Sequence, residues 1–166
     1  MNWDAIGAVG EVLGAVLVAG TLIYLIIQVR QNSASINATT NQANISAFNQ
    51  LNAILAENPN LAAILLKGTE HPEQLTDEEN LSFTWIVRAY LNLYLTLYDQ
   101  YRHGTCPEYL WHRHATELKT MTGTPGFQEF LQIDASFQEL YDYVDSLPEV
   151  DTMQTGLRLK IKPGTG

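Results

Sequence analysis

The chain has 166 residues and a formal net charge of −9, with 46% hydrophobic residues and one cysteine. Because phosphate binding draws its affinity from clustered Lys and Arg, nine scattered basic residues argue against a nucleic-acid partner. The single Cys106 excludes an intrachain disulfide and favours a reducing compartment.

We predict one long helix from Trp3 to about Glu57 that passes through two environments. Its first half, residues 5–27, is almost entirely apolar, and at about 1.5 Å per residue it can cross a hydrocarbon core of about 30 Å. Residues 1–29 are therefore predicted to be a transmembrane anchor in contact with membrane lipid. A cleaved signal peptide lacks support because no Lys or Arg precedes the apolar segment, and a core helix of a soluble protein is normally shorter.

Three residues indicate how the span is placed. Trp3 and Tyr24 lie about 31 Å apart along a helix axis, so each ring falls near one membrane interface. Arg30 is the first basic residue after the span. The positive-inside rule then predicts an N-terminus outside and a helical domain in the cytoplasm.

One face of the predicted span carries small and polar side chains. At about 100° per residue, this glycine face comprises Gly7, Gly10, Glu11, Gly14, Val18 and Thr21. The GxxxG spacing of Gly10 and Gly14 allows two helix backbones to approach closely. We predict a helix–helix interface here, in a homo-oligomer or in a larger membrane protein complex.

Glu11 allows three interpretations, because an unpaired carboxylate within a span costs about 2.5–3.5 kcal/mol. It can reach the headgroups of the outer interface, or it can be protonated or hydrogen-bonded within a helix–helix contact. The third interpretation is a ring of carboxylates at the mouth of a cation pore. This defines the alternative function, a small homo-oligomeric ion channel with Glu11 and Asn32 lining the pore.

Residues 30–57 are predicted to form a polar helical stalk, with no charged side chain between Gln31 and Ala56. A narrow apolar seam for helix pairing or pore lining comprises Ile36, Thr40, Ala43, Ala47, Leu51 and Ile54. The alternative is a partly disordered linker.

Start and stop signals predict a cytoplasmic helical domain at residues 58–148. Five helices are expected: 61–66 closed by Gly68, 76–101 or 103 opened by a Thr76–Glu79 capping box, 105–121 opened by a similar box, 127–133, and 136–147. The tail, residues 149–166, alternates at 157–162 and could add a strand. The predicted fold class is all-α.

Four tyrosines share one face of the longest domain helix: Tyr90, Tyr94, Tyr98 and Tyr101. They form either a partner surface, since aromatic residues are enriched in interfaces, or a core with hydroxyls at its rim.

Candidate ligands and nucleophiles lack the spacing that chemistry requires. His112 and His114 lie about 200° apart on a helix, and no CxxC or HExxH motif accompanies them or Glu117. His103 with Cys106 is a weak Cys–His couple. We expect no enzyme, no cofactor and no metal site.

Several short motifs resemble a group of uncharacterised bacterial membrane-anchored proteins. They are residues 28–33 after the span, 75–79, 101–104, Trp111, Phe127 and Phe137, and the resemblance extends to about Leu147. It implies an anchored helical architecture in a bacterial inner (cytoplasmic) membrane and carries no activity. The function expected is a single-pass interaction or assembly protein that associates through its glycine-rich span.

Overall fold

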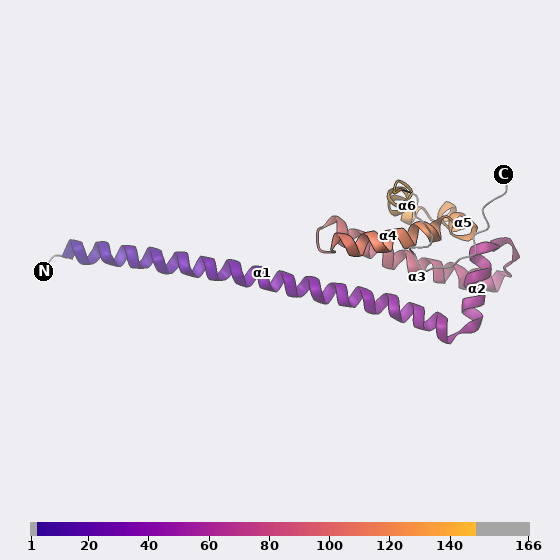
Figure 1. The fold of residues 1–166 in the computed structure, drawn as a ribbon, viewed down its shortest axis with the longest axis horizontal. Helices are drawn as coiled ribbons and strands as arrows, with labels where there is room; N and C mark the ends of the chain where they lie inside the picture. The colour runs from indigo at the N-terminus through magenta and orange to yellow at the C-terminus, as the bar shows by residue number, and fades with distance from the viewer. Residues whose placement is uncertain (1–2, 149–166) are drawn as a thin grey trace. The chain divides into compact units, whose positions relative to one another are not determined.

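A computed structural model describes the backbone of residues 3–148 and the side chains of Trp3 and residues 7–148 (Figure 1). Throughout this range the regular elements are helices, which confirms the all-α prediction. The chain divides into two compact units, residues 1–42 and the remainder from Ala43. The predictions for residues 149–166, including the strand, lie outside the described residues.

Helix α1 (Trp3–Glu57) confirms the long N-terminal helix, including the segment for which a disordered linker was the alternative. Proline and helix-ending glycine are absent from residues 28–56, so the backbone hydrogen bonds can continue without a break. α1 is long and apolar enough to cross a membrane. Its apolar residues are exposed in the isolated chain, as Val12 and Val16 illustrate at 63% each.

The second unit is a small helical bundle. Its elements are α2 (Pro59–Glu70), the short 3₁₀ helix η1 (Pro72–Gln74), α3 (Asp77–Arg102), α4 (Glu108–Thr122), α5 (Pro125–Ile133), the 3₁₀ helix η2 (Ala135–Phe137) and α6 (Gln138–Asp145). α3 and α4 lie side by side, and α6 packs on α4 (Figure 1). The last residues of α1 belong to this unit, so the compact domain starts at Ala43 and not at the predicted residue 58.

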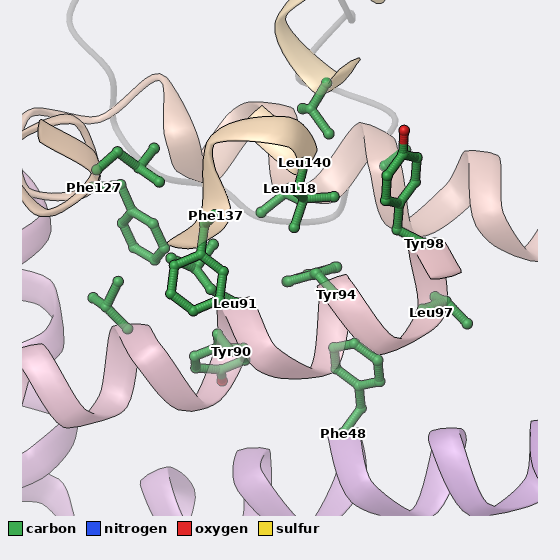
Figure 2. Close-up of a cluster of buried hydrophobic side chains, with 14 of the residues drawn as sticks. Phe48, Tyr90, Leu91, Tyr94, Leu97, Tyr98, Leu118, Phe127, Phe137 and Leu140 are labelled. Atoms are coloured by element: carbon green, nitrogen blue, oxygen red, sulfur yellow. The ribbon is translucent and has the colours of Figure 1, made fainter. Parts of the chain in front are cut away.

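A continuous apolar core joins α3 to α4, α5 and α6. Trp111, Leu118 and Val144 are fully enclosed, and Figure 2 shows Leu118 and Leu140 facing the side chains of α3. The Trp111 indole N–H donates to the Tyr143 hydroxyl at 3.3 Å. A buried indole needs such a partner, so this bond fixes α6 against α4.

The predicted capping box at the start of α3 is confirmed. The Thr76 hydroxyl accepts from the Glu79 backbone N–H at 3.3 Å, and the Glu79 carboxylate accepts from the Thr76 N–H at 2.9 Å. Lys67 of α2 donates to the same carboxylate at 2.6 Å. These hydrogen bonds, led by that from Lys67, lower the pKa of Glu79.

Two predicted helix ends are wrong. The Thr105 hydroxyl donates to the Gln100 carbonyl at 3.0 Å, so it finishes α3 and does not cap α4, which begins after Pro107. Gly68 does not close α2 but lies inside it, against the ring of Phe83. A glycine is favoured there by close packing and not by a left-handed backbone.

Candidate functional site

The glycine face of α1 is open along the described part of the first unit. A Cβ added at Gly7, Gly10 or Gly14 would meet no atom within 4 Å. Val18 is 61% exposed, whereas the Thr21 hydroxyl is already satisfied because it donates to the Leu17 carbonyl at 2.8 Å. The glycine face therefore has no protruding side chains at its three glycines. The Thr21 hydroxyl on this face already donates a hydrogen bond within the helix.

Glu11 is exposed on this helix and takes part in none of the ion pairs found among the described residues. Asn32, Ile36 and Thr40 follow it on α1, within the first unit. Asn32 and Ile36 are exposed as well, and the Ile36 side chain is 57% accessible. A pore or a seam that uses these residues would be formed by other copies of the chain.

The residues in the lower part of the predicted seam are divided between packed and exposed positions. Phe48 and Leu55 are the buried residues of α1 in the second unit, whereas Ile54 is 44% exposed and Ala43 is exposed too. The predicted Ala47 and Leu51 are half-buried between them. The face of α1 that packs on the bundle thus includes Phe48 and Leu55 beside two residues of the predicted seam, and Ala43 and Ile54 stay exposed in the single chain.

Polar contacts fix this register. The Tyr90 hydroxyl donates to Asn52 Oδ1 at 2.7 Å, and Asn44 Nδ2 donates to Gln100 Oε1 at 2.6 Å. Two asparagines of the uncharged stalk segment therefore make specific side-chain bonds to α3. A shifted register would break both hydrogen bonds and would leave the hydroxyl of the buried Tyr90 without this acceptor.

The tyrosine face of α3 is core, so the partner-surface prediction is corrected. Tyr94 is fully buried, Tyr90 and Tyr98 are nearly so, and Tyr101 is half-buried against the Trp111 ring at 5.6 Å between centroids. Figure 2 shows the Phe48 ring of α1 pointing at Tyr94, 5.1 Å away between centroids. Burial raises the pKa of Tyr94 well above its ordinary value. Its hydroxyl therefore stays protonated and donates to Met121 Sδ at 3.7 Å.

The second unit contains a pocket of about 700 Å³ that sequence patterns did not reveal. It lies between residues 45–56 of α1, α2 and residues 110–121 of α4, over Tyr90 and Tyr94 of α3. Leu110, His114, Glu117 and Met121 line it from α4. Their three- and four-residue spacing places them on one helix face, and this spacing is the part of the pocket that the sequence indicates.

The charged groups that line this pocket lie on α4. His114 Nδ1 lies 3.5 Å from Glu117 Oε2, and the imidazole stacks on the Phe48 ring at 4.8 Å between centroids. The neighbouring His114 is the main cause of a lowered pKa at Glu117. Buried as it is, His114 Nδ1 has no hydrogen-bond partner in the described part of the chain. The cluster thus combines the Glu117 carboxylate with a buried imidazole nitrogen of His114 that makes no hydrogen bond to the described residues.

The other residues considered for chemistry are placed apart. His112 pairs with Glu108 at 3.2 Å on the surface of α4, and Cys106 is buried, with its pKa raised by burial. His103 Nδ1 lies 2.6 Å from the Asp99 carbonyl oxygen. Among the described side chains, those of Trp3 and residues 7–148, no group of three His, Cys, Asp or Glu residues is arranged to hold a metal ion.

No family model, curated protein or solved structure matches this chain. The class of protein is therefore given by the architecture of residues 3–148: helices throughout, with one helix long and apolar enough to cross a membrane, and a compact helical unit.

Proposed function

We propose that this chain is a single-pass protein of the inner (cytoplasmic) membrane that self-associates, or joins a larger membrane complex, through its glycine face. The observation that carries the proposal is the open backbone at Gly7, Gly10 and Gly14 on one side of α1. In lipid no hydrophobic driving force brings helices together, so close backbone packing at small residues is the main source of attraction. The described helix offers that packing surface without any rearrangement.

Glu11 adds a polar reason for association. A carboxylate on a lone span faces lipid at a cost, which falls when the group is hydrogen-bonded within a helix–helix contact. Glu11 is exposed in the single chain, next to Gly10 and Gly14. Association through the glycine face would remove this carboxylate from lipid as the backbones approach.

The proposed orientation rests on charge. Arg30 is the first basic residue after the apolar segment, and the described second unit follows it. The positive-inside rule therefore places the helical unit in the cytoplasm and the N-terminus outside. A buried free thiol at Cys106 fits the reducing side of the membrane.

The test is the native mass of the full chain in a lipid nanodisc, compared among two glycine variants. Gly14→Leu places a large side chain on the glycine face, whereas Gly20→Leu makes the same change about 120° around the helix. Both positions are open in the isolated helix, so neither change strains it. We expect Gly14→Leu to yield monomers and Gly20→Leu to keep the wild-type oligomer.

Two results would count against this function. If Gly10→Leu combined with Gly14→Leu leaves the oligomer unchanged, the glycine face is not its interface. If the wild-type chain is a monomer, self-association is excluded and a partner protein is required. Pull-down from native membranes then follows, with loss of that partner expected for Gly14→Leu and not for Gly20→Leu.

A further inference from the structure

The pocket in the second unit has the form of an open groove. Its α1 wall, residues 45–56, and its α4 wall, residues 110–121, are each about 16 Å long at 1.5 Å per residue. Two lining alanines, Ala56 and Ala62, are exposed at its mouth, and the lining Leu66 is 53% exposed. The volume of about 700 Å³ falls within the range of small-molecule sites, about 300–1,000 Å³.

The lining is mostly apolar, with polar groups at few places. Phe48, Leu55 and Leu65 are among the apolar side chains, and Tyr94 has its hydroxyl occupied by Met121. When a hydrocarbon replaces water against the apolar surface of a concave site, the free energy of the system falls. An apolar groove with lining segments of this length and an open side therefore suits a single flexible hydrocarbon chain.

Two opposite charges stand one helical turn apart on the α4 wall. Arg113 is exposed, lines the groove and makes none of the ion pairs found among the described residues, and Glu117 lies four positions further on. Between them, His114 Nδ1 lacks a hydrogen-bond partner in the described part of the chain. The charged residues that line the groove are one cation, Arg113, and one anion, Glu117, so a purely anionic or cationic head group would meet one repulsive neighbour.

We propose that this groove binds a zwitterionic monoacyl lipid, with its chain along α1 and α4, its phosphate at Arg113 and its ammonium group at Glu117. Guanidinium groups bind phosphate strongly, and a carboxylate attracts a quaternary or primary ammonium. The bilayer that holds the membrane-spanning part of α1 supplies the lipid. The inference rests on the proposed function only in this respect, because the membrane anchor keeps the groove near that bilayer. Binding itself needs neither self-association nor a partner protein.

The experiment uses the full chain in a phospholipid nanodisc with a monoacyl phosphatidylcholine that carries a photoreactive diazirine in its chain. After irradiation, mass spectrometry maps the adducts. Adducts on residues 7–27 serve as an internal reference, because the span contacts lipid whatever the oligomeric state. We expect a second group of adducts on residues 45–56 and 110–121.

Matched alanine variants test whether the groove holds the probe. Ala62→Phe fills the mouth, whereas Ala63→Phe makes the same change at an exposed neighbour that does not line the pocket. Ala56→Phe and Ala53→Phe form a second such pair on α1. We expect about tenfold fewer groove adducts in the lining variants, which is the loss of about 1.4 kcal/mol. The control variants should match the wild-type chain.

The head group and the chain are tested by competition against the same probe. Monoacyl phosphatidylcholine should compete better than myristate or an uncharged monoacylglycerol, and Arg113→Gln should remove the preference over monoacylglycerol. Each added methylene should tighten binding about fourfold until the chain fills the groove.

Adducts confined to the span, equal adducts in Ala62→Phe and Ala63→Phe, or a preference for myristate would overturn the inference. A cross-link from the groove to a second protein chain would overturn it as well, because the groove would then hold a helix. A monomeric protein with groove adducts would reject self-association and support lipid binding, so the two failures are distinguishable.

Discussion

Gly126 at the start of α5 lies directly against the backbone of Gly68 in α2: a Cβ added at Gly126 would be 1.9 Å from the Gly68 carbonyl oxygen. A Cβ added at Gly68 would in turn lie 2.4 Å from the Phe83 ring. α2, α3 and α5 therefore meet at a point where two helices have no side chain between them. This contact determines how α5 closes the bundle next to the pocket.

We predict that Gly126→Ala destabilises the folded state by about 1–3 kcal/mol or more, because backbone atoms must move to admit the methyl group. Gly123→Ala is the control, since its Cβ would lie 3.5 Å from the Lys119 carbonyl oxygen, an ordinary contact, in a helical backbone. That variant should be neutral or gain up to about 1 kcal/mol. Urea unfolding followed by tryptophan fluorescence measures both, and equal stabilities would contradict the close contact.

Local signals in the sequence determine much of this fold. The capping box at Thr76 and the absence of breakers after residue 27 depend on neighbours in the chain, so they were readable directly. The sequence does not show that Gly68 lies inside α2, because a glycine used for close packing has the same letter as one used for a turn. Only the partner helix distinguishes them.

The candidate sites show the same limit. The glycine face follows from helical periodicity alone, whereas the choice of Phe48 over Ile54 as the packed residue depends on where α3 lies. The tyrosine spacing showed a common face but not whether that face is covered. The pocket is lined by residues of α1, α2, α3, α4 and α5, so no pattern within one helix could define it.

The register of α1 on the bundle gives the second prediction. Phe48→Ala should lower the free energy of unfolding by about 3 kcal/mol, because it empties a buried site that contacts Tyr94 and His114. Ile54→Ala should cost less than about 1 kcal/mol, since that side chain is 44% exposed. Hydrogen exchange of residues 43–57 should accelerate only in Phe48→Ala. Equal acceleration in both variants would contradict the packed face.

Glu117 gives a pH-dependent prediction. The pKa of its carboxyl is lowered in the folded chain, mainly by His114, from an ordinary value of 4.5. The resulting stability is therefore present above about pH 4.5 and is lost as the pH falls through the lower folded-state pKa. Glu117→Gln should lower the free energy of unfolding by about 0.5–1 kcal/mol at pH 7. The effect is small because the side chain is 35% exposed and solvent screens its interaction with His114.

The measurement for Glu117 is urea unfolding of the wild-type chain and Glu117→Gln between pH 7 and pH 3. The difference in stability should shrink as the pH falls below 4.5. Glu139→Gln serves as a control. Glu139 forms an exposed ion pair with Arg102, outside the pocket, and its ion pair does not involve His114. A difference for Glu117→Gln that persists at pH 3 would show that its effect comes from shape and not from charge.

Cys106 provides the final prediction, because it is the only cysteine and alkylation therefore reports on one site. Its side chain is 5% exposed, and burial raises the pKa of the thiol. Since the thiolate is the reactive form, iodoacetamide should modify the folded chain at least about tenfold more slowly than the unfolded one at pH 8. The pH midpoint of the reaction should also move upward on folding.

The control combines Cys106→Ala with Ser46→Cys. Position 46 on α1 is exposed, so a cysteine there should react at the rate of the unfolded chain. Rapid alkylation of native Cys106, equal to that control, would show that the turn between α3 and α4 opens readily and that the thiol is not held in the core.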